Sequence, residues 1–94
     1  MLTKVIGNTG LYSLSSTTGT HQATRLDGQS KIKVRIAVTQ PAVVNFGTAV
    51  ADNNSDLLLP AGTVEHFTLD STSTVSYVLL TGASTGTISI STVA

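Results

Sequence analysis

Glu65 and His66 are an adjacent acid and histidine, the residue types that carry general acid–base catalysis. Successive residues of a β-strand point to opposite faces, so in a strand these two side chains would not meet. The many serines do not change this, because a catalytic triad is defined by geometry and not by composition. The sequence predicts one buried and one exposed side chain here, and no enzymatic activity.

Residues 52–56 read Asp-Asn-Asn-Ser-Asp, a run of the oxygen ligands that calcium prefers. An EF-hand loop starting at Asp52 needs Gly at its sixth position and Glu at its twelfth, where Leu57 and Thr63 stand. The chain has no Cys and two histidines, which is thin for a zinc site. We therefore predict no metal and no cofactor, and we interpret residues 52–56 as a solvated loop.

Lys31, Lys33 and Arg35 alternate with apolar residues, so a strand would place all three on one face. This face could dock a negatively charged partner surface, or be an ordinary solvated face, or protect a sheet edge from pairing. Nucleic acid is not the expected partner. The formal net charge is zero, and no aromatic side chain stands beside the cations for stacking.

Leu57, Leu58 and Leu59 follow the polar loop and precede Pro-Ala-Gly at residues 60–62, a turn sequence. Three consecutive leucines in a loop cannot easily all face one core. Two interpretations remain open: some of them are buried beneath the loop, or one or two lie in a subunit interface. With the three cations, they are the candidate interface residues of the chain.

The composition is that of one small domain with a weakly charged surface. Its 94 residues fit one domain. Charged residues make up 11% of the chain, against about 25% in ordinary soluble domains. Thr and Ser supply most of the polarity, and Thr favours strands. A domain of this size without disulfides or metals is modestly stable, so we expect it to form a homo-oligomer.

Alternation of apolar and polar residues predicts an all-β fold, most clearly at residues 31–40. The other predicted strands are residues 42–46, 63–69, 74–80 and 87–93, with shorter candidates at 3–6, 11–14 and 20–25. This spacing is typical of a small antiparallel β-sandwich or barrel, here jelly-roll-like. We expect residues 31–94 to form the core of the single domain. Residues 1–30, punctuated by glycines, are expected to form an irregular N-terminal arm or short edge strands.

The sequence shows no targeting or membrane signal. The first ten residues lack the apolar core of a signal peptide. No apolar run approaches the roughly 20 residues of a membrane span. We expect a soluble protein, made in the cytoplasm, that has no membrane partner.

Three segments of the chain carry a resemblance: residues 34–49 (VRIAVTQPAVVNFGTA), 55–69 (SDLLLPAGTVEHFTL) and 86–92 (GTISIST). They resemble short virion structural proteins of tailed bacteriophages. The resemblance implies a β-sandwich subunit on the outer surface of the phage head, made in the host cytoplasm. Its implied role is capsid decoration or cementing, as a trimer that clamps the major capsid protein or other virion proteins. The family offers no catalytic or metal residues to carry over, and residues 1–30 match nothing in it.

Two kinds of alternative stay open. The chain could be another particle component, such as a head-fibre base, a head–tail connector or a tail component. It could also be a carbohydrate-binding β-sandwich module, although its aromatic residues are few: Tyr12, Phe46, Phe67 and Tyr77. An exposed aromatic pair in a groove would favour sugar binding, and a flat apolar patch near residues 57–59 would favour assembly.

Overall fold

The computed structural model describes residues 5–23, 31–47, 51, 56–69 and 74–93. The regular elements in these residues are β-strands, which confirms the all-β prediction. They are β1 (Val5–Leu14), β2 (Gly19–Gln22), β3 (Ile32–Val38), β4 (Ala42–Phe46), β5 (Leu57–Leu59), β6 (Val64–Leu69), β7 (Thr74–Leu79) and β8 (Gly86–Val93).

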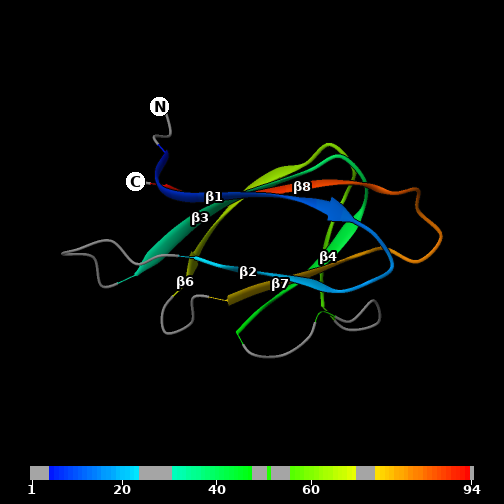
Figure 1. Cartoon of the computed structure of the whole chain (residues 1–94), viewed down its shortest axis with the longest axis horizontal. Helices are drawn as coiled ribbons and strands as arrows, with labels where there is room; N and C mark the ends of the chain where they lie inside the picture. The colour runs from blue at the N-terminus through cyan, green and yellow to red at the C-terminus, as the bar shows by residue number, and fades with distance from the viewer. Residues whose placement is uncertain (1–4, 24–30, 48–50, 52–55, 70–73, 94) are drawn as a thin grey trace.

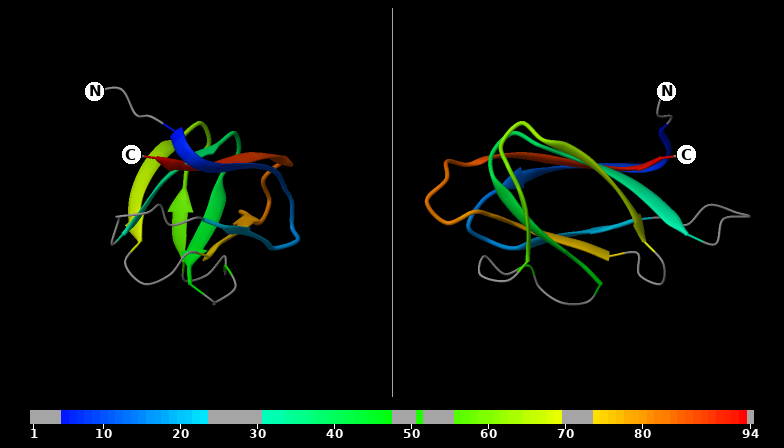
Figure 2. Two further views of the ribbon diagram at one scale, coloured as in Figure 1. Left: turned by 60° about the vertical axis from the view of Figure 1, so that its left-hand side comes forward. Right: turned by 180° about the vertical axis from the view of Figure 1, so that it is seen from behind.

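Two four-stranded antiparallel sheets lie face to face (Figures 1 and 2). The first sheet has the order β1-β8-β3-β6, and the second has the order β2-β7-β4-β5. The first strand pairs with the last, the second with the seventh, the third with the sixth and the fourth with the fifth. The chain is therefore one long hairpin of nested strand pairs that alternate between the two sheets. This arrangement is a jelly roll, and it is a sandwich of two sheets, one of the two forms that the sequence left open.

The core lies between the sheets and follows the predicted alternation. On β3, Ile32, Val34, Ile36 and Val38 are buried, while Lys33 between them is exposed. On β8, Ile88 and Ile90 are also fully buried. The second sheet adds a matching set of buried residues: Ala42, Val44, Leu59, Val75, Tyr77 and Leu79. β7, which is apolar on both faces, lies between β2 and β4, as we expect for a central strand.

The region of residues 1–30 contributes an edge strand to each sheet. β1 pairs with β8 from Val5–Val93 to Leu14–Gly86, with an irregular register between Val5 and Thr9. β2 pairs with β7. Of the two expected forms, an irregular arm or edge strands, residues 5–14 and 19–22 therefore adopt paired edge strands. Residues 1–4 and 24–30 lie outside the described residues.

The turn at residues 60–62 is confirmed and has a defined geometry. The Thr63 amide donates a hydrogen bond to the Pro60 carbonyl at 3.2 Å. Gly62 occupies the third position with φ +75°, the left-handed conformation that a type II turn requires there. This turn carries the chain from β5 in the second sheet to β6 in the first.

Candidate functional site

β5 exposes two of its three leucines at one edge of the second sheet. Leu57 and Leu58 are each 47% exposed, whereas Leu59 is 3% exposed and belongs to the core. The expectation of a loop here is wrong. β4 offers backbone partners to this segment, with Val44 opposite Leu57 and Ala42 opposite Leu59. One leucine is therefore buried, and two remain available for contact.

The leucine edge, which we define as Leu57 and Leu58, is held in place by contacts on both sides of it. The Asn45 side chain donates a hydrogen bond to the Asp56 carboxylate at 2.7 Å, just before β5 begins. The type II turn fixes the other end. Because the two leucines are successive in a strand, Leu57 projects on the core side of the sheet and Leu58 on the outer side. A partner that approached this edge would meet apolar surface on both sides.

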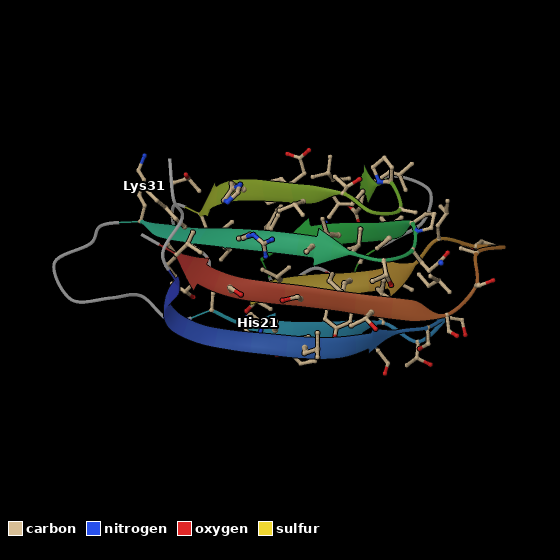
Figure 3. The ribbon with its side chains drawn as sticks, turned by 90° about the horizontal axis from the view of Figure 1, so that it is seen from above. His21 and Lys31 are labelled. Atoms are coloured by element: carbon tan, nitrogen blue, oxygen red, sulfur yellow. The ribbon has the colours of Figure 1, made fainter. Side chains whose placement is uncertain are left out.

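The second candidate surface is the outer face of the first sheet. Figure 3 looks down on it, with Lys31 at the start of β3. Lys33 and Arg35 project from this face, opposite Thr68 and His66 of β6. β3 lies between β8 and β6, in the interior of the sheet. The edge-protecting interpretation of these cations is therefore wrong, because β3 is not an edge strand. We call this surface the basic face.

The pairing registers show which residues lie beside one another on the basic face. Leu11 of β1 lies opposite Ser89 of β8, Ser89 lies opposite Ala37 of β3, and Ala37 lies opposite Val64 of β6. Leu11 is 73% exposed and Val64 is 45% exposed. This row therefore has large apolar side chains at both ends and small side chains in the middle.

Glu65 and His66 project on opposite sides of the first sheet, as predicted. Glu65 lies opposite the buried Ile36, and His66 lies opposite Arg35 on the basic face. The expectation that one of the pair is buried is wrong, because both are exposed. β6 is an edge strand, so even its core-side residue reaches solvent.

Residues 82–86 read Gly-Ala-Ser-Thr-Gly and so have the letters of the Gly-x-Ser-x-Gly nucleophile elbow. That elbow is a sharp turn from a strand into a helix. Here the segment connects two strands, β7 and β8, and Ser84 in its centre is exposed. The structural context of the elbow is missing, so we do not assign Ser84 a catalytic role.

A polar cluster in the interior is formed by residues from three strands. The Tyr12 hydroxyl of β1 is hydrogen-bonded to Nδ1 of His21 of β2 at 2.5 Å. The Tyr12 and Tyr77 rings lie 5.3 Å apart between centroids. Burial lowers the pKa of His21, and burial together with Tyr12 raises the pKa of Tyr77. Figure 3 shows His21 behind β1 and β8, on the side of the first sheet away from the basic face.

The other two aromatic residues contact each other. Phe46 of β4 and Phe67 of β6 lie 5.0 Å apart between ring centroids and pack against the core. With Tyr12 and Tyr77 turned inward, none of the four aromatic rings of the chain is fully exposed. The surface does not present the aromatic platform that a sugar-binding site uses.

Two kinds of feature are absent from the described part of the chain. Its residues hold no group of three or more His, Cys, Asp or Glu side chains that could bind a metal ion. They also contain no helix of the length and apolarity that a membrane span requires. Of the predicted polar loop, Asp56 is described and is bonded to Asn45, while residues 52–55 lie outside the described residues.

Comparisons with protein-family models, with curated proteins and with solved structures gave no match to this chain. The function must therefore be argued from the two candidate surfaces and from the sequence.

Proposed function

We propose that this chain is a structural subunit of a phage particle, and that its role is to decorate the capsid. In this role it binds the major capsid protein lattice on the outer surface of the head and stabilises it. The observation that carries the proposal is the kind of side chain that the surface exposes. The large exposed apolar side chains among the described residues are aliphatic: Leu11, Leu57, Leu58 and Val64. Exposed apolar surface of this kind is typical of contact with other proteins.

The sequence and the fold both support this proposal. The segments that resemble short virion proteins lie in β3, β4, β5, β6 and β8, and they include the leucine edge and part of the basic face. Jelly rolls occur in viral capsid proteins and in lectins, so the fold is compatible with a particle component. Because one fold hosts many functions, the fold supports the proposal by analogy.

We further propose that the chain is a homo-oligomer, with three copies as the favoured number, and that the leucine edge lies between copies. A charged fraction of 11% leaves little repulsion between copies that pack closely. An oligomer also lets several weak contacts with a lattice add up to firm binding. The proposal includes no catalytic step, no cofactor, no nucleic acid and no membrane.

The other candidates differ in what they require of the surface. A head-fibre base, a connector or a tail component would use the same aliphatic surfaces at another place in the particle. A carbohydrate-binding module would require exposed aromatic rings, and here Tyr12 and Tyr77 contact each other, as do Phe46 and Phe67. The aliphatic surface therefore favours assembly over sugar binding.

Co-sedimentation tests the proposal. The purified chain is mixed with head shells from the phage that encodes it, after the endogenous copies have been stripped off. We expect the chain to pellet with the shells at a fixed ratio to the major capsid protein, and to make the shells more resistant to heat. Binding to isolated tails, with none to heads, would reassign the chain to the tail, and failure to bind either would refute the role in the particle.

A further inference from the structure

We propose that the basic face is a docking surface and that its partner is an acidic surface of another protein. This inference deepens the proposed function. It rests on that function where it assigns the acidic surface to a protein of the phage particle. The basic face consists of the outward residues of the first sheet, among them Leu11, Lys33, Arg35, Val64, His66 and Ser89.

The distribution of charge in the described residues selects the chemistry of the partner. The cations, Lys31, Lys33 and Arg35, are in β3 or immediately before it, and Lys33 and Arg35 project to one side. The described carboxylates lie elsewhere. Asp56 is bonded to Asn45 in the second sheet, and Glu65 occupies a core-side position opposite Ile36. Among the described residues the first sheet thus presents a positive face, and a surface that bears carboxylates complements it.

The position of the cations argues for a contact surface. Lysines on edge strands commonly serve to prevent unwanted pairing between sheets. Lys33 and Arg35 are on an interior strand, where the neighbouring strands already satisfy the backbone. They lie two residues apart, which separates their Cα atoms by about 7 Å. Two carboxylates spaced similarly on a partner could engage both cations at once.

The shape of the face fits a partner that lies across the strands. The row from Leu11 to Val64 crosses four strands, a distance of about 14 Å at ordinary strand spacing. Small side chains, Ser89 and Ala37, lie between the exposed apolar ones. The row of Ser91, Arg35 and His66 lies next to it. A protein segment placed across the sheet would contact apolar groups at both ends and cations along one side.

These features favour a protein over a nucleic acid. A nucleic acid would require clustered cations and aromatic rings on which bases stack. The described face offers exposed leucine and valine side chains instead, together with two cations and one histidine. The basic face also belongs to the first sheet, whereas the leucine edge belongs to the second. Contacts between copies and contacts with the partner can therefore form on separate surfaces.

Site-specific photocrosslinking in infected cells tests the inference. A photoreactive amino acid replaces Ser89 in the middle of the basic face, and, as a control, Thr20 on the outer side of β2 in the second sheet. We expect the probe at position 89 to crosslink one protein, at a peptide that contains several Asp or Glu residues. The probe at position 20 should not give this product. A product with nucleic acid, a product with a peptide that lacks acidic residues, or no specific product would overturn the inference.

Charge reversal supplies the second measurement. In Lys33→Glu/Arg35→Glu, we expect the yield of the position-89 crosslink to fall about tenfold or more, because like charges now oppose each other. In Lys33→Arg/Arg35→Lys, the yield should stay near that of the wild type. Circular dichroism checks that both variants fold. An unchanged yield in the reversed variant would contradict the inference.

The same experiment separates the inference from the proposed function. A crosslink to an acidic peptide of a virion protein supports both. A crosslink to an acidic peptide of a protein outside the particle supports the docking surface and contradicts the role in the particle. A crosslink to a virion protein through a peptide without acidic residues supports the role in the particle and contradicts the docking surface.

Discussion

Tyr77 lies directly opposite Gly19 in the pairing of β7 with β2, and its ring occupies the space that a Cβ on Gly19 would need. The ring of Tyr12 likewise occupies the space that a Cβ on Gly10 would need, and Gly10 lies two residues before Tyr12 on β1. Both glycines therefore lie in strands, and because they lack a side chain they leave room for a tyrosine ring. The two rings meet in the interior and connect β1, an edge strand of the first sheet, with β7, an interior strand of the second.

Replacing Gly19 with Ala is expected to destabilise the domain by about 1–3 kcal/mol, the usual cost of overpacking a filled interior. The clash involves the rigid ring of Tyr77, so a small side-chain movement cannot relieve it. Urea denaturation measures the effect, with Thr20→Ala at the exposed neighbouring position as the control.

A double-mutant cycle shows whether the ring is the cause. In a Tyr77→Ala background, Gly19→Ala should cost little, because the atoms that it meets are gone. An equal cost with and without the ring would show that the glycine is required for another reason.

Acid is expected to destabilise the domain through His21. Burial lowers the pKa of His21 in the folded state, whereas in the unfolded chain a histidine titrates near its ordinary value of about 6.5. The unfolded state therefore binds the proton more readily. The stability that the neutral ring contributes is complete above pH 6.5 or so and is lost as the pH falls toward the lower, folded-state pKa.

Thermal unfolding between pH 7.5 and pH 5 measures this effect. His21→Gln should unfold at a lower temperature at neutral pH but show a flatter pH dependence. His66→Gln, at the exposed histidine, is the control variant. A His21→Gln variant with the same pH dependence as the wild type would contradict this account of His21.

Gly62→Ala is expected to cost about 1–2 kcal/mol, the penalty for an L-residue in the left-handed conformation. The space around Gly62 is open, so strain in the backbone, at φ +75°, would be the cause. Ser84→Ala, at an exposed position between β7 and β8, should be nearly neutral by the same denaturation measurement. A Gly62→Ala variant as stable as the wild type would show that the turn readily changes its conformation.

The sequence predicts the strands whose alternation is regular, and it fails where tertiary contacts decide. Ile32 to Val38 alternate strictly, so the buried face of β3 was predictable. Gly10 and Gly19 looked like punctuation because the rings that replace their side chains come from Tyr12 and Tyr77, and no local pattern reveals that packing. The leucine run looked like a loop because three residues are too few to show a period, and β4 supplies the partner that makes it a strand.

The candidate site was predictable in its residues and not in its arrangement. The sequence identified Lys31, Lys33 and Arg35 as sharing one face, but it could not show whether their strand lies at an edge. Strand order depends on pairing between distant segments, such as β3 with β8, which short-range patterns do not encode. Leu11 was missed as a surface residue, because a leucine in a candidate strand is ordinarily assigned to the core.

The central claim is that this chain works by assembly, and native mass spectrometry of the wild type and of Leu57→Ser/Leu58→Ser tests it most directly. The account predicts an oligomer for the wild type, with a trimer favoured, and a folded monomer for the variant, because Leu57 and Leu58 form the edge through which we propose that copies pack. Leu11→Ser removes an exposed leucine from the other sheet and should leave the number of copies in the oligomer unchanged. A wild type that stays monomeric at tens of micromolar, or a variant with the same oligomeric mass as the wild type, would contradict the account.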